Sequence, residues 1–131
     1  MIDSRAKVCE EHVFPLVESV KPDMLTTGED NCYRQGMMMS PDQFREFCSP
    51  YYRKVADLAR HVGVPVVAVD SDGAVGDLVD CLAECGVNAL GPFEVKAGND
   101  LAAVRRKHPT FIMMGGLEKE VLSCVICFLI I

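Results

Sequence analysis

The chain has 131 residues, of which 13 are Lys or Arg and 19 are Asp or Glu, so its formal charge is −6. Half of the residues are hydrophobic, which is too large a fraction for a disordered chain and is typical of a single globular domain. The acidic balance, with no long run of Lys or Arg, excludes a basic nucleic-acid-binding module.

The cysteines and the apolar segments indicate the cellular compartment in which the chain is expected to fold. Seven cysteines are an odd number, and the chain does not open with a secretory signal, so a reduced, cytoplasmic setting is expected. The most apolar run, CVICFLII at 124–131, is far shorter than the roughly 20 residues that span a membrane. We therefore expect neither nucleic acid nor a membrane among the partners.

The first third of the chain predicts helix, strand and helix. Apolar residues three and four apart predict a helix over 3–20, kinked at Pro15, and residues 23–27 predict a strand followed by an irregular loop through Met39. Ser40 with Gln43 forms a capping-box signature for the next helix, which Pro50 should bend or split with Ser49 as a second cap.

The remaining chain alternates strands and helices. Strands are predicted at 64–69, 87–92 and 110–114, and helices at 74–85, at 100–107 with Asn99 as the cap, and from Leu117 to Leu122. Such alternation predicts an α/β fold with a parallel sheet and right-handed crossovers, as in a (β/α) barrel or a doubly wound sheet.

Acidic residues and glycines follow the predicted strands, where both architectures place their ligands. These residues are Glu29, Asp30, Asp70, Ser71, Asp72, Glu94, Gly115 and Gly116. A single loop carboxylate usually faces solvent or caps a helix. Carboxylates after three successive strands suit acid–base chemistry or a hard cation, and the glycine pair suits either a close ligand approach or a simple turn.

Several motifs together resemble the uroporphyrinogen decarboxylase superfamily, which includes the methylcobamide–coenzyme M methyltransferases. The matching segments, together with Tyr33 and Gly36, are GED at 28–30, SPDQFREF at 40–47, PYY at 50–52, VDSDG at 69–73, GVNA at 86–89, PFEV at 92–95, AGND at 97–100 and GGLEK at 115–119. The order and spacing of these segments agree over about three quarters of the chain, which is more specific than any one of them.

The resemblance implies a partial (β/α)8 barrel. The family fold is a barrel of about 250 residues, about twice the length of this chain. The resemblance places the four predicted strands in its C-terminal half. We expect residues 1–122 to form this half barrel and 123–131 to be an off-pattern hydrophobic tail. The chain then resembles a truncated family member, with a missing N-terminal half or self-association as its means of completing the barrel.

The resemblance also implies the chemistry of intact relatives, which is decarboxylation of uroporphyrinogen in porphyrin biosynthesis or corrinoid-dependent methyl transfer. Asp72, Glu94 and Asp70 would be the catalytic residues. Glu29, Asp30, Ser71, Gly115 and Gly116 would contact a tetrapyrrole or corrinoid-protein substrate. The alternative is an inactive fragment that only self-associates.

The resemblance bears on cofactors as well. Decarboxylation would need no cofactor, whereas methyl transfer would need a corrinoid partner and could also use a metal. The family's zinc methyltransferases carry His-x-Cys where this chain has Asp70, Ser71 and Asp72. Of these, Asp70 is the candidate metal ligand, and the Asp-Ser-Asp-Gly form resembles the corrinoid-linked branch.

Overall fold

The structure is a computed structural model that describes residues 2–118 and 120–121. Its main sheet contains four strands in the order β1-β4-β5-β6, and every neighbouring pair is parallel. The strands are β1 (Met24–Gly28), β4 (Val66–Asp70), β5 (Ala89–Phe93) and β6 (Ile112–Gly115). This order confirms the predicted parallel sheet, and each strand begins within two residues of its predicted start.

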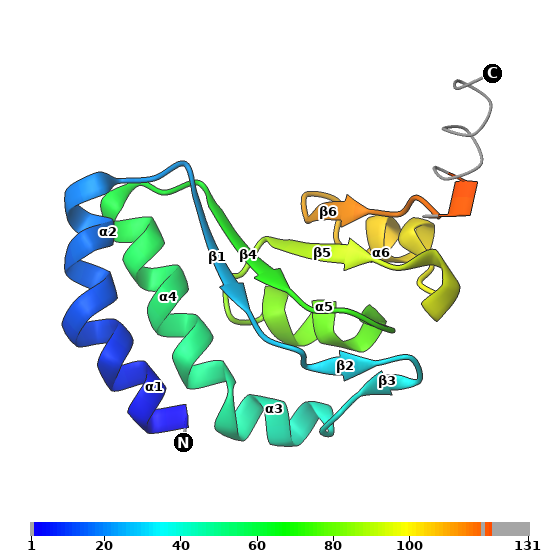
Figure 1. Ribbon diagram of the computed structural model, residues 1–131, viewed down its shortest axis with the longest axis horizontal. Helices are drawn as coiled ribbons and strands as arrows, with labels where there is room; N and C mark the ends of the chain where they lie inside the picture. The colour runs from blue at the N-terminus through cyan, green and yellow to red at the C-terminus, as the bar shows by residue number, and fades with distance from the viewer. Residues whose placement is uncertain (1, 119, 122–131) are drawn as a thin grey trace.

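A helix precedes each strand of the main sheet (Figure 1). In chain order the helical segments are α1 (Ile2–Val8), the π-helical turn η1 (Cys9–Val13), α2 (Phe14–Val20), α3 (Pro41–Phe47), α4 (Ser49–Val62), α5 (Gly76–Ala83), the 3-10 turn η2 (Val95–Ala97) and α6 (Leu101–Lys107). Parallel strands joined through helices form a mixed α/β unit that corresponds to part of a (β/α)8 barrel.

The helices cover one face of the sheet. Val67, Val69 and Leu90 point toward them and belong to the same buried core as Phe44 and Tyr52. The alternate strand positions lie on the opposite face, which in a barrel is the interior. There Met24, Ile112 and Met114 remain exposed, because no described element packs on the two outer strands from that side.

Five local predictions differ from the structure, wholly or in part. Residues expected to be an irregular loop form a short antiparallel hairpin, β2 (Cys32–Tyr33) with β3 (Gly36–Met37). Ahead of Pro15 the helix widens into η1, where the Phe14 N–H reaches the Cys9 carbonyl, so the missing proline donor is absorbed without a break. The predicted helix from Leu117 is not formed at Leu117 or Glu118, but Glu120 and Val121 are helical; Leu122 and the predicted tail lie outside the described residues.

The other two corrections concern caps. Pro50 does separate α3 from α4, but the Ser49 hydroxyl donates to the Phe44 carbonyl at 3.4 Å and caps nothing. Asp100, and not Asn99, caps α6, because its carboxylate accepts the Ala103 N–H at 2.9 Å. The capping box of Ser40 and Gln43 is confirmed.

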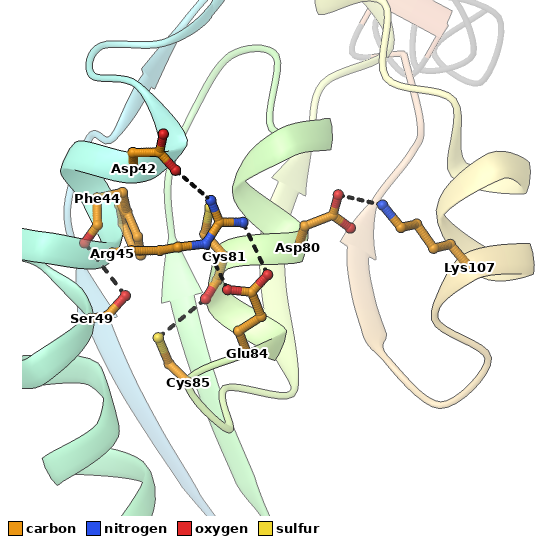
Figure 2. Close-up of polar contacts among 9 residues, drawn as sticks. All are labelled: Asp42, Phe44, Arg45, Ser49, Asp80, Cys81, Glu84, Cys85 and Lys107. Atoms are coloured by element: carbon orange, nitrogen blue, oxygen red, sulfur yellow. Dashed lines mark hydrogen bonds and ion pairs between the residues drawn. The ribbon is translucent and has the colours of Figure 1, made fainter.

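Ion pairs join neighbouring helices on the outer surface (Figure 2). Arg45 of α3 makes a two-pronged contact with Glu84 at the end of α5, with N–O distances of 2.9 and 3.0 Å. The two carboxylate oxygens of Asp80 on α5 contact Lys107 at 2.5 Å and His108 at 2.7 Å, which ties α5 to α6. Among the described residues, no helix is long and apolar enough to cross a membrane.

Candidate functional site

The carboxyl ends of the four parallel strands meet at one edge of the sheet, and two cavities open there. The first, the β5–β6 cavity, has a volume of about 320 Å³, and the second, the hairpin cavity, about 460 Å³. Asp72, Glu94 and Lys96 line both. The β5–β6 cavity is completed by Pro92, Phe93, Val95, Gly115, Leu117, Glu118 and Glu120, and the hairpin cavity by Asp30, Cys32, Tyr33, Arg34, Met38, Gly73 and Ala97.

A tight turn after β4 holds Asp72 at this edge. Ser71 is fully buried: its N–H donates to the Gly91 carbonyl at 2.9 Å, and its hydroxyl accepts the Asn31 N–H at 3.1 Å. Gly73 has a φ of +90°, and a Cβ there would lie 2.6 Å from the Tyr33 carbonyl oxygen. The turn therefore requires glycine, and Ser71 serves to fix it.

Glu94 and Asn99 bind the same turn from the other side. One Glu94 carboxylate oxygen accepts the Gly73 N–H at 3.0 Å. The Asn99 amide donates to the carbonyls of Gly73 and Glu94, both at 2.9 Å, and its oxygen accepts the Val75 N–H at 2.9 Å. Asn99 thus joins the loops after β4 and β5, a function that sequence reasoning missed. The adjacent Asp100 was a hint, because it left Asn99 free to do something other than cap α6.

Asp70 lies on the interior face of the sheet. It alternates with Val67 and Val69, which face the helices, and its partners across the sheet are Gly28 and Gly91. Because both of these neighbours are glycines, no side chain from an adjacent strand of the described sheet lies beside the exposed Asp70 carboxylate. Among the described residues, no three His, Cys, Asp or Glu side chains are arranged to hold a metal ion, at Asp70 or elsewhere.

The two acids after β1 diverge. Glu29 turns toward the helices, where its carboxylate pairs with Arg5 of α1 and accepts from the Tyr52 hydroxyl of α4 at 3.5 Å. Asp30 is exposed and lines the hairpin cavity with Asp72 and Glu94. The structure therefore brings Asp30, Asp72 and Glu94 to one cavity and places Glu29 outside it.

Gly115 and Gly116 allow close packing of the chain on itself. A Cβ on Gly115 would lie 2.8 Å from the Phe93 nitrogen, and one on Gly116 would lie 2.5 Å from a Leu101 methyl. Both have positive φ, and the Gly116 N–H donates to the Phe93 carbonyl at 2.9 Å. Gly115 also lines the β5–β6 cavity, whereas Gly116 closes the end of β6 against α6.

The cavities contain two further titratable groups. Burial raises the pKa of the Cys32 thiol to about 11, outweighing its hydrogen bond to Ser71, so this thiol is protonated at neutral pH. Lys96 pairs with Glu120 and with Glu118, the latter at 3.5 Å, and these contacts raise the pKa of its ammonium group. Lys96 is a cation beside Asp72 and Glu94 that the sequence pattern did not single out.

Comparison with known proteins places this edge of the sheet in a family context. A family model described as uroporphyrinogen decarboxylase (URO-D) matches residues 23–124, which span all four strands of the main sheet. The chain belongs to the uroporphyrinogen decarboxylase family. Neither the curated proteins nor the solved structures gave a significant match.

Proposed function

We propose that the carboxyl edge of this sheet binds a tetrapyrrole-type macrocycle and that the chain is a corrinoid-linked methyl-transfer member of its family. The observation that carries the proposal is the convergence of Asp72 and Glu94 on two adjoining cavities at the ligand-binding edge of a parallel sheet. The described strands would be the C-terminal half of the family barrel, with Asp70 facing its interior.

The charge of the described edge favours a corrinoid over uroporphyrinogen. Uroporphyrinogen is a polycarboxylate, whereas most corrinoid side chains are neutral amides. The cavity walls carry the acids Asp30, Asp72, Glu94, Glu118 and Glu120 against the cations Arg34 and Lys96. An acidic wall repels a polyanion and tolerates a neutral amide rim.

In the proposed chemistry, the Asp72 carboxylate accepts a proton from the methyl acceptor. A corrinoid would supply an electrophilic methyl group, and a protic acceptor of that group would release its proton. A carboxylate at the strand edge can take this proton as a general base. Glu94 and Asn99 would hold the Asp72 turn in place, and Asp30 would orient the acceptor or the macrocycle rim.

Binding and turnover of the purified chain test this proposal. Hydroxocobalamin and uroporphyrin are titrated separately by absorbance, and methyl transfer from methylcobalamin and decarboxylation of uroporphyrinogen are assayed. We expect saturable binding of the corrinoid and weaker binding of the porphyrin. Asp72→Asn and Glu94→Gln should each weaken corrinoid affinity about tenfold, since a hydrogen bond to a charged group contributes about 1.5–3 kcal/mol.

Asp42→Asn is the matched control, because Asp42 is a nearly fully exposed acid on α3 that lines neither cavity. It should leave both affinities unchanged. Preferred binding of uroporphyrin would move the assignment to the decarboxylase side of the family. Binding of neither macrocycle would favour the second candidate, an inactive chain that only associates.

A further inference from the structure

The two outer strands of the sheet each have a free edge. In the residues that the structure describes, β1 is hydrogen-bonded only to β4, and β6 only to β5. We propose that a second copy of this chain occupies both edges, so that two copies close one (β/α)8 barrel around a twofold axis and share its mouth. This inference rests on the sheet and its helices and does not depend on which ligand the mouth binds.

The strand and helix arrangement fits such a closure. The described chain supplies four parallel strands, each preceded by a helix, and an eight-stranded barrel needs twice that number. Four strands cover half of the ring, so a twofold rotation places β1 of each copy beside β6 of the other. The two junctions are then identical and leave no edge open, and the ring has the eight strands of a (β/α)8 barrel.

Apolar surface is exposed on both sides that would meet. Helix α2 buries Val17 and packs Phe14 against its own core, but Leu16 and Val20 beside them are 63% and 71% exposed. The apolar stripe of α2 is thus wider than the part of it that the rest of the chain buries. On the interior face of the two outer strands, Met24, Ile112 and Met114 are 48%, 39% and 36% exposed.

Closure of the barrel would cover the exposed apolar residues beside both outer strands. In a barrel, the helix before a strand packs over the groove between that strand and the preceding one. For α2 the preceding strand would be β6 of the partner copy, which would cover Leu16 and Val20. Ile112 and Met114 of β6 lie on the interior face, where closure of the barrel would enclose them together with Met24 of β1. Exposed apolar side chains beside an open sheet edge are typical of interaction sites.

Sharing the mouth has a consequence for the site. All four strands of the main sheet point the same way, so a twofold axis along the barrel brings both carboxyl edges to one end. The second copy then places its own Asp70 and Asp72 across the mouth, supplying the half of the ring that one copy lacks. The candidate site is therefore complete only in the dimer.

Light scattering of the full 131-residue chain tests the proposal without any ligand. One copy has a mass of 14.4 kDa, and we expect a species of about twice that mass. Leu16→Glu places a charge in the proposed junction and should shift the species to a monomer at the same concentration. Phe47→Glu is the matched control, because Phe47 is similarly exposed, at 52%, but lies on α3 between the two junctions, and it should leave the dimer intact.

Circular dichroism of both variants checks that they remain folded. A wild-type monomer at every concentration would overturn the proposal, whether the edges are covered within the chain or by a different polypeptide. An open series of higher oligomers, or equal sensitivity to Leu16→Glu and Phe47→Glu, would also overturn it. Failure of corrinoid binding in a proven dimer would instead count against the proposed function alone.

Discussion

The turn that carries Asp72 is held by backbone groups more than by the acid itself. The Gly73 N–H donates to the Glu94 carboxylate, and the Gly73 carbonyl accepts from the Asn99 amide. Because Gly73 has no side chain, the backbone of Tyr33 can lie directly against it. The hairpin, the loop after β4 and the loop after β5 therefore meet at one residue. This is why Asp72 can hold a fixed place although it is exposed.

Gly73→Ala should accordingly destabilise the fold by about 3 kcal/mol. The left-handed φ costs an L-residue roughly 1–2 kcal/mol, and the new methyl would also collide with backbone that has no flexible end to yield. Gly63→Ala is the control: Gly63 has a φ of +82° but open space around the new methyl. Urea unfolding should show a loss of only about 1 kcal/mol there, and equal losses at both sites would contradict the close contact with Tyr33.

At the scale of elements, sequence patterns predict what depends on long regular periodicity. The apolar runs of β4 and β5 and the capping box of α3 needed no tertiary information, and all three appear where expected. The hairpin β2–β3 was missed because its strands have two residues each, too short for any period, and it is held by its contacts with the turn after β4.

The same limit applies to the candidate site. The rule that acids after parallel strands share one edge correctly brought Asp72 and Glu94 together. It could not foresee Glu29, because the direction of that side chain is decided by Arg5 and Tyr52, which approach from helices distant in sequence. Nor could it distinguish Asn99 from Asp100, since both residues are good caps and only the packing of the loop after β5 separates their uses.

The junction between α5 and α6 should depend on pH through Asp80. Burial opposes ionisation of this carboxyl, but Lys107 and His108 outweigh it, so its pKa lies below the ordinary value. A group with a depressed folded-state pKa stabilises the fold above its unfolded pKa and loses that contribution as the pH falls through the folded-state value. The stabilisation is therefore present at neutral pH and disappears in acid.

Asp80→Asn should lower the free energy of unfolding by up to about 1 kcal/mol at pH 7, the usual upper range for partly exposed ion pairs. The difference from wild type should shrink as the pH falls below about 4. Urea unfolding at a series of pH values measures both. Asp57→Asn, which breaks a more exposed pair with Arg60 within α4, should cost less, and a pH-independent Asp80→Asn effect would show that packing and not charge is lost.

At the scale of the whole molecule, the main sheet has two central strands and two outer strands with different numbers of partners. Strands β4 and β5 are hydrogen-bonded on both sides, and Val69, Ala68, Ala89 and Leu90 are fully buried, whereas β1 and β6 are bonded on one side only.

In the monomeric Leu16→Glu variant, amides of β4 and β5 should exchange with deuterium only on global unfolding, and those of β1 and β6 should exchange faster by local opening. In the proposed wild-type dimer the edge strands would gain partners, so their exchange should slow toward that of the centre. Peptide-resolved hydrogen exchange compares the two states, with Phe47→Glu expected to match wild type. Edge strands that exchange equally fast in wild type and in Leu16→Glu would show that association leaves the sheet edges unpaired and takes place through some other surface.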